Sequence, residues 1–454
     1  MQVAVIDTGI DTDHPDLADN IIGEACLTFD SNGVFDPSRC PGIAQGHPAE
    51  DDNGHGTHVS GIITSRGAVA APRGAAPNAG IFAYKVIPGS WAGIVAALDN
   101  ILDEHMPNGV PEFQFINMSI GSGPFTYAPG ECEPEAPPPF AEAQAISEAL
   151  DDLRDQGVLA FIASGNNGVK QRMSFPGCVQ AAVAVGATYD ANVGPGTCDS
   201  STAPDQVTCF SNSSDDLDVL APGSQILSTW HAGFGVNNLS GTSMAAPHAA
   251  AAAALLVNAQ PWLDPTDLPL DERRAATDVF EQRLKDTGVA VTDQLRDSDP
   301  ATFRTTLRVD PWAALFTDEV GDFDLDGCTN AQEFGEDQDV GGLRNPYSFW
   351  DFFDVPSGTS LARDRIIGGA DLAAIVARFG SNDAGPGDFN RNSDPLSTPN
   401  PPVLPSGTRQ NYHPAYDRGG TILGASLWHL KPPNGSIGAS ELAQLLNQFG
   451  DTCL

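Results

Sequence analysis

The first 316 residues predict an α/β domain in which helices pack on both faces of a mostly parallel sheet. Short apolar runs rich in β-branched residues recur along this part of the chain, and stretches with helical periodicity separate them. The runs do not alternate polar with apolar residues, which is typical of parallel strands buried on both faces. We therefore expect strands and helices to alternate, with the strands in one central sheet.

The expected strands follow in order along the chain. They are VAVID at 3–7, IFAYKV at 81–86, FQFINMSI at 113–120, VLAFIAS at 158–164, AAVAVGA at 181–187 and LDVLAP at 217–222.

Helices are expected between these strands and after the last of them. The predicted ranges are 55–64, 91–102, 141–156, 242–258 and 271–287, and residues 306–315 would complete the closing layer. Gly157 follows the third range, as glycine often follows a helix. The fourth range, TSMAAPHAAAAAALLVN, is rich in alanine and predicts a long buried helix despite Pro247 in its interior.

The composition changes after Phe316, where the chain becomes rich in Asp, Gly and Pro. A repeat follows, because IGGADLAAIVARFG at 367–380 aligns without gaps with IGASELAQLLNQFG at 437–450. Each copy predicts one amphipathic helix, and the two would pack together. The expected division is one domain at 1–316, an acidic linker at 317–345 and a small C-terminal domain with a duplicated helical unit at 346–454.

The chain is strongly acidic, with 59 Asp and Glu against 22 Lys and Arg and a formal net charge of -37. Such a surface repels nucleic acid and anionic membranes, so we expect neither as a partner. It favours solubility, and some of its carboxylates are available to bind calcium. No apolar run is long enough to span a membrane.

The eight cysteines are even in number and include no C-x-x-C pair, which favours disulfides over metal sites. We expect Cys26 to pair with Cys40, Cys198 with Cys209 and Cys132 with Cys178. Such bridges indicate an oxidising, extracellular compartment. Buried free thiols are the alternative.

Three segments carry residues of complementary chemistry: VAVIDTGID around Asp7, DDNGHGTHVSG around His55 and SGTSMAAPH around Ser243. A serine hydroxyl is a weak nucleophile that needs a base within hydrogen-bond reach, and the base needs an acceptor that fixes its tautomer. Taken singly, Asp7 and Ser243 could be helix caps and His55 a structural helix-start residue. Together, at strand ends and helix starts, they predict a catalytic triad.

These motifs resemble those of the subtilisin-like serine proteases, over about residues 1–316. The resemblance implies a three-layer αβα fold and a serine endopeptidase that hydrolyses the peptide bonds of proteins through an acyl-enzyme intermediate. It implies that Asp7 orients His55, that His55 accepts and returns a proton, and that Ser243 attacks the scissile carbonyl. It also implies protein or peptide substrates, secretion, and catalysis without a cofactor.

Two further segments resemble the substrate-binding parts of that family. ASGNNG at 163–168 resembles its oxyanion-hole motif, with Asn166 as side-chain donor beside the Ser243 backbone N–H, although an Asn near Gly is otherwise a turn signal. NMSIG at 117–121 resembles the strand that pairs with the substrate. The implied pocket walls are Ser119, Ile120, Gly121, Ala163, Ser164 and Gly165. Pocket depth would depend on residues 169–178, and we expect a broad or hydrophobic preference.

The chain departs from the family pattern at its start. It begins MQVAVI, with no basic residues of a signal peptide, and enters a strand at once, so we expect that an upstream segment is missing. Asp16, in HPDL, resembles a calcium ligand of many relatives. The companion ligands would come from a leading segment and from a loop that is short here, SRGAVAAPRGAAP, which argues against calcium at Asp16.

The acidic linker contains GDFDLDGCTNAQEF, which has the D-x-D-x-D-G spacing of an EF-hand-type calcium loop and a Glu at position 12. The expected Ca2+ ligands are Asp322, Asp324, Asp326, the Cys328 carbonyl, Asn330 and Glu333. An acidic linker without metal is the alternative. The repeat beyond residue 345 loosely resembles dockerin-type modules, which would give the chain a scaffold or surface partner.

Two other classes of function compete with a serine protease. A non-catalytic binding protein could keep the same fold, but the complete triad and Asn166 argue against it. A metal hydrolase could use His14, His55 and His58, but no H-E-x-x-H or similar ligand spacing is present.

Overall fold

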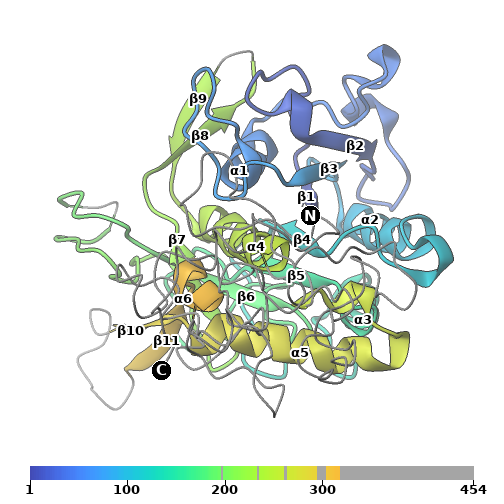
Figure 1. The fold of residues 1–454 in the computed structure, drawn as a ribbon. Coiled ribbons are helices and arrows are strands. Elements are labelled where there is room, and N and C mark those ends of the chain that lie inside the picture. The colour runs from blue at the N-terminus through green and yellow to red at the C-terminus, as the bar shows by residue number, and fades with distance from the viewer. Residues whose placement is uncertain (196–197, 233–234, 260–262, 294–302, 317–454) are drawn as a thin grey trace, which may run out of the picture. The chain divides into compact units, whose positions relative to one another are not determined.

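A nine-stranded sheet lies at the centre of the part of the chain that the structure describes (Figure 1). This part of the computed structural model comprises residues 1–316 without 196–197, 233–234, 260–262 and 294–302. The strand order is β10-β11-β7-β6-β5-β4-β1-β3-β2, and neighbours are parallel except for β10 and β11. The predicted α/β class with a mostly parallel sheet is confirmed. The predicted calcium loop and duplicated helices lie outside the described residues.

The strands of this sheet are β1 Gln2–Asp7, β2 Ile21–Cys26, β3 Gly80–Lys85, β4 Phe115–Met118, β5 Leu159–Ala163, β6 Val183–Thr188, β7 Val219–Pro222, β10 Val289–Asp293 and β11 Arg304–Arg308. A separate antiparallel hairpin consists of β8 Ile226–Trp230 and β9 Gly235–Leu239. The helices are α1 His55–Thr64, α2 Trp91–Glu104, α3 Ala143–Asp155, α4 Thr242–Ala259, α5 Leu270–Asp286 and α6 Pro311–Phe316.

Helices cover both faces of the sheet, and each face has its own hydrophobic core. Val3 and Val5 of β1 pack in one core with α1 and α4, whereas Ala4 and Ile6 pack in the other with α2 and α3. Successive residues of a strand point to opposite faces, so an unbroken apolar run supplies both cores. Three layers result, as the sequence predicts.

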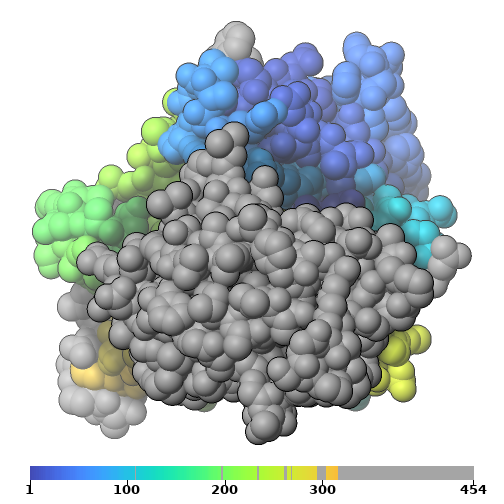
Figure 2. Space-filling view, in the orientation of Figure 1, coloured from blue at the N-terminus to red at the C-terminus, as the bar shows by residue number. Residues whose placement is uncertain are grey.

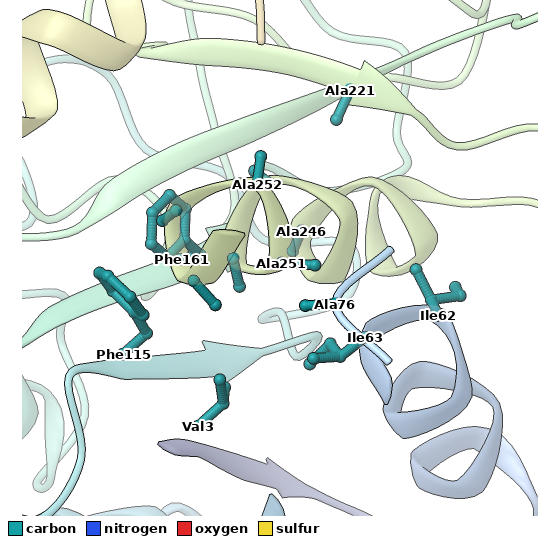
Figure 3. Close-up of a cluster of buried hydrophobic side chains, with 14 of the residues drawn as sticks. Val3, Ile62, Ile63, Ala76, Phe115, Phe161, Ala221, Ala246, Ala251 and Ala252 are labelled. Atoms are coloured by element: carbon teal, nitrogen blue, oxygen red, sulfur yellow. The ribbon is translucent and has the colours of Figure 1, made fainter. Parts of the chain in front are cut away.

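Helix α4 is buried along most of its length because its alanines allow close packing. Figure 3 shows Ala246 and Ala251 on the side of α4 that faces Ile63 of α1, while Phe115 and Phe161 of the sheet point toward the same helix. This packing fixes the height of α4 above the sheet. It therefore also fixes the position of its first turn, which contains Ser243.

The helix bounds agree with the prediction to within two residues, but several strands were not predicted. The edge strand β2 and the hairpin β8–β9 are only partly buried, so they lack the unbroken apolar runs that marked the central strands. Residues 306–315, expected in the closing layer, divide between the end of β11 and α6.

The three predicted disulfides are confirmed as Cys26–Cys40, Cys132–Cys178 and Cys198–Cys209. The Cys198–Cys209 disulfide lies in the segment between β6 and β7. This segment is green in Figure 2 and projects at the left side of the view. Within the described ranges, no helix has both the length and the hydropathy to cross a membrane.

Candidate active site

The carboxyl ends of β1, β4 and β5 lie at one edge of the sheet because these strands are parallel neighbours. Asp7 is the last residue of β1, Ser119 follows β4, and Asn166 comes shortly after β5. The first residues of α1 and α4 are hydrogen-bonded to this edge, through Thr8 and Asn166. Loops at the carboxyl ends of parallel strands are the usual place for a functional site.

The Asp7 carboxylate and the His55 imidazole form a close pair, with Asp7 Oδ1 2.7 Å from His55 Nδ1. A carboxylate can only accept, so Nδ1 donates and Nε2 is left as the acceptor on the other side of the ring. Asp7 Oδ1 also accepts the Thr8 backbone N–H at 2.7 Å. The Asp7 side chain is buried, whereas that of His55 is 28% exposed, so a ligand can reach the imidazole but not its partner.

The pKa of His55 is raised above its ordinary value. Burial alone would lower this pKa, but the charge of Asp7, its hydrogen bond to the ring and the charge of Asp51 together outweigh burial. His55 is therefore a stronger base than an isolated histidine, and it must be neutral to act as one.

Asp51 is 5% exposed and fixes the turn that precedes His55. Its Oδ1 accepts two backbone N–H groups of that turn, each at 3.0 Å. Its Oδ2 accepts the N–H and the hydroxyl of Thr57 at 3.0 and 2.6 Å. The Thr8 hydroxyl donates to Asp51 Oδ1 at 3.0 Å and accepts the Gly56 N–H at 2.8 Å. Asp51 was not predicted from the sequence, where its one distinguishing feature is its place inside the motif DDNGHGTHVSG around His55.

Glycines on both sides of His55 allow α1 to approach the end of β1. Gly54 has φ 104°, a conformation that favours glycine. A Cβ on Gly56 would lie 2.2 Å from the Gly9 carbonyl oxygen, so only glycine fits there. These contacts bring the His55 ring to Asp7.

Ser243 is the second residue of α4 and is joined to Ser119 by two hydrogen bonds of opposite direction. Its hydroxyl donates to the Ser119 carbonyl oxygen at 3.3 Å, and the Ser119 hydroxyl donates to the Ser243 carbonyl oxygen at 2.7 Å. Among the described residues no hydrogen bond joins Ser243 to His55. The structure therefore brings Asp7 and His55 into contact and leaves the serine hydroxyl on a neighbouring carbonyl.

The Asn166 side chain is oriented by Thr242, the residue before Ser243. Its Oδ1 accepts the Thr242 backbone N–H at 2.8 Å and the Thr242 hydroxyl at 3.0 Å. Because the oxygen is occupied, only the amide nitrogen is available to a ligand. A neutral hydrogen-bond donor thus lies beside the start of α4, where the helix dipole is positive.

Asn212, which was also not predicted from the sequence, holds the loop on both sides of Asn166. Its Oδ1 accepts the backbone N–H groups of Asn167 and Val169 at 2.9 and 3.2 Å. Its Nδ2 donates to the Ser164 carbonyl oxygen at 3.2 Å. Asn212 is fully buried, so these bonds are shielded from water. No sequence motif marked this residue.

A hollow of about 270 Å³ lies beside Ser243. It is lined by Ile120, Gly121, Gly123, Ala163, Gly165, Asn166, Asn167, Ser174, Thr242 and Ser243. Four of the expected wall residues are among these, but Ser119 and Ser164 are not. Ser164 is fully buried, and its hydroxyl donates to the Asn212 carbonyl oxygen at 3.1 Å. Ser174 comes from the 169–178 loop, whose path the sequence could not give.

The described residues do not favour a metal hydrolase. His14 Nε2 lies 3.0 Å from the Gly235 carbonyl oxygen, and His58 Nε2 lies 3.1 Å from that of Ile226, so both nitrogens act as donors. In the described part of the chain, the one group with metal-ligand spacing is Cys198, Asp199 and Cys209, and its two cysteines form a disulfide.

Asp16 does not fit a calcium site in this structure. Its carboxylate accepts the backbone N–H groups of residues 68–71 at 2.6 to 3.1 Å. Burial raises the pKa of Asp16, but these four hydrogen bonds together lower it by more, so its pKa lies below the ordinary value of an aspartate. The short loop thus surrounds the carboxylate with donors where a metal would need acceptors.

The sequence matches the model of the subtilase family over residues 1–294. An alkaline protease of Alkalihalobacillus alcalophilus is 33% identical over 290 residues, which are 64% of this chain and 62% of that protein. Subtilisin Savinase of Lederbergia lenta is 32% identical over 290 residues, 64% of this chain and 88% of that protein. A crystal structure of a cold adapted subtilisin-like serine proteinase is 25% identical, with a TM-score of 0.45, over 68% of this chain and 88% of that chain.

Proposed function

Because the chain belongs to the subtilase family, we propose that it is a serine endopeptidase that hydrolyses proteins through an acyl-enzyme intermediate. The observation that supports this most strongly is the 2.7 Å pair of Asp7 and His55 at the sheet edge where α4 begins with Ser243. The matched region is 62% of the length of the alkaline protease relative, so the activity, the substrates and the partners are proposals for this chain.

In the proposed reaction, Ser243 Oγ attacks the peptide carbonyl while neutral His55 accepts its proton. The Ser243 hydroxyl first turns from the Ser119 carbonyl toward His55 Nε2. Asp7 stabilises the imidazolium, which then protonates the leaving amine as the C–N bond breaks and the acyl-enzyme remains. A water molecule, deprotonated by His55, hydrolyses the ester and frees Ser243.

The proposed donors to the tetrahedral oxyanion are Asn166 Nδ2 and the Ser243 backbone N–H. Thr242 occupies Asn166 Oδ1 at 2.8 Å, which leaves the amide N–H groups for the substrate. The positive end of α4 adds to the stabilisation of the developing charge. The contacts with Thr242 hold the Asn166 amide in this orientation without a bound substrate.

The hollow beside Ser243 is the proposed specificity pocket. Its wall carries no formal charge, and it is formed by small residues, one isoleucine, asparagines and hydroxyl groups. We expect it to accept uncharged side chains broadly. Extended substrates would pair with the backbone of residues 119–121 and 163–165.

The test is labelling of the full chain with a fluorophosphonate, followed by peptide mapping. The modification should be found on Ser243 and should disappear in Ser243→Ala. Ser240→Ala is the matched control, because Ser240 lies three residues away and its oxygen accepts the Gln225 backbone N–H, and it should label normally. A folded chain that is not labelled would instead be a non-catalytic binding protein.

A structural Ca2+ in the loop at 322–333 is also proposed. Its support is the ligand spacing in the sequence, since the loop lies outside the described residues. Calcium should slow cleavage between the catalytic domain and residues 346–454, and Asp322→Ala with Glu333→Ala should remove this protection. The measurement is a time course of fragmentation with calcium or chelator for both chains. Equal fragmentation in all four conditions would leave an acidic linker.

An extracellular location is proposed from the three disulfides, which form in oxidising compartments. Protein and peptide substrates fit such a location. The duplicated C-terminal unit is the proposed attachment point for a scaffold or surface, which its loose resemblance to dockerin modules supports.

A further inference from the structure

We infer that the Ser119 hydroxyl is a positioning group for the nucleophile, because it supplies the hydrogen bond that Pro247 removes from α4. This inference rests on the proposed role of Ser243. It concerns the side chain of Ser119, whereas the expected part of this residue in substrate binding concerned its backbone.

Pro247 creates a gap in the hydrogen bonds of α4. In an α-helix each backbone N–H donates to the carbonyl four residues earlier, so residue 247 would donate to Ser243. Proline has no N–H, and its ring crowds that carbonyl. Pro247 nevertheless lies inside α4 and is buried. The Ser243 carbonyl, in the helical turn that carries the nucleophile, therefore needs a hydrogen-bond donor from outside the helix.

Ser119 provides this donor from the end of β4. Its hydroxyl lies 2.7 Å from the Ser243 carbonyl oxygen, and the residue is only 6% exposed. Asn117 Nδ2 donates to the same hydroxyl oxygen at 3.1 Å, which directs the Ser119 proton toward Ser243. The chain of donors thus runs from Asn117 through Ser119 to the main chain of the nucleophile.

The Ser119 side chain acts on the main chain of Ser243 and not on the substrate, because Ser119 does not line the hollow. Without this hydroxyl, the first turn of α4 would keep the packing of the helix but lose its hydrogen bond to the end of β4. A small displacement of the nucleophile lowers the rate of the chemical step more than it weakens substrate binding. We therefore expect a change in kcat with little change in KM.

A mutant cycle in the full-length chain tests the inference. Ser119→Ala should lower kcat for peptide hydrolysis by roughly tenfold, with KM nearly unchanged. Pro247→Ala returns an N–H opposite the Ser243 carbonyl, so the double variant should recover most of the lost kcat. Each hydrolysis rate is divided by the concentration of active sites, which is measured by titration with a fluorophosphonate. The resulting kcat then describes the active molecules alone, even if part of a preparation is misfolded.

Ser147→Ala is the matched control. Ser147 is fully buried and its hydroxyl donates to the Cys132 carbonyl oxygen at 2.8 Å, in α3 on the opposite face of the sheet. Its removal should lower the midpoint of thermal unfolding but leave kcat per titrated site unchanged.

Two results would overturn the inference. The first is that the wild-type chain is active and Ser119→Ala has the same kcat. The other is a loss of kcat that Pro247→Ala leaves untouched, since Ser119 would then act by a route other than the Ser243 carbonyl. A wild-type chain that neither hydrolyses peptides nor is labelled at Ser243 contradicts the proposed function itself, so the two failures are distinguishable.

Discussion

The two halves of the proposed active site are held together by different chemistry. The charged half consists of Asp7, Asp51 and His55, and its two buried carboxylates accept hydrogen bonds from the ring and from the turn around it. The neutral half consists of Asn166, Ser243 and the amide and hydroxyl groups that hold them. Its contacts come from segments that are far apart in the sequence.

This difference separates two tasks. The carboxylates determine how basic His55 is, because their charges raise its pKa against the effect of burial. The neutral groups add no charge near His55. Their hydrogen bonds hold the proposed nucleophile and the proposed oxyanion donor in place. Changes in the charged half should therefore alter the pH dependence of the reaction, and changes in the neutral half should alter its maximal rate.

The largest expected effect is that of Ser243→Ala, which removes the proposed nucleophile from the neutral half. Peptide hydrolysis should fall by about 10⁶-fold, as it does in subtilisin when this group is lost. The fold should survive because alanine is a good helix former at the start of α4. Steady-state kinetics and circular dichroism check the two statements, and turnover near wild type would contradict the triad.

Asn166→Gly should lower kcat by roughly 10²- to 10³-fold with a small change in KM, because the oxyanion donor acts in the transition state, as the equivalent group does in subtilisin. Asn167→Gly is the matched control. Asn167 donates to the Gly123 carbonyl oxygen at 3.0 Å and is not a proposed oxyanion donor, so its kcat should fall much less. An effect of Asn166→Gly on KM alone would assign it to substrate binding.

Asn212→Ala should lower kcat by roughly tenfold, since it loosens the loop that presents Asn166. The effect should nearly vanish in the Asn166→Gly background, because Asn212 acts through that residue. The measurement is kcat for the two single variants and the double variant. Fully additive losses would show that Asn212 supports the fold without positioning the donor.

Asp51→Asn should have the smallest effect on the maximal rate and a clear effect on stability. It replaces one acceptor oxygen by a donor amide opposite buried N–H groups, which should cost about 2 kcal/mol of unfolding free energy. Chemical denaturation measures this loss. An unchanged stability would mean that the turn before His55 does not depend on the carboxylate.

The sequence was sufficient to predict the Asp7–His55 pair of the charged half, because these two residues lie in short motifs at a strand end and a helix start. Asp51 was not predicted, although it lies in the same motif as His55. Asp7 and His55 meet as expected, since Asp7 ends β1 and the first turn of α1 is hydrogen-bonded to the next residue, Thr8. Patterns of neighbouring residues, namely short apolar runs and helical periodicity, also predicted α1 and the central strands. They failed for the partly buried β2 and β8–β9, whose apolar runs are interrupted.

The supports of the neutral half could not be predicted in the same way. Asn212 contacts the Asn166 loop only because β5 and the segment before β7 are brought together by the fold. Ser174 reaches the hollow through a loop whose path depends on a disulfide and on pairing with Tyr127. Neither Asn212 nor Ser174 lies in a sequence motif that would indicate its role.

The pH dependence of kcat/KM for the wild type, Asp51→Asn and Asn212→Ala tests the division of tasks most directly. The wild-type rate should rise with pH to a plateau, with a midpoint above the ordinary pKa of histidine, because only neutral His55 accepts the Ser243 proton. Asp51→Asn should move this midpoint to lower pH, and Asn212→Ala should lower the plateau without moving it. A wild-type profile that is flat from mildly acidic to alkaline pH, or equal midpoint shifts in the two variants, would contradict the account.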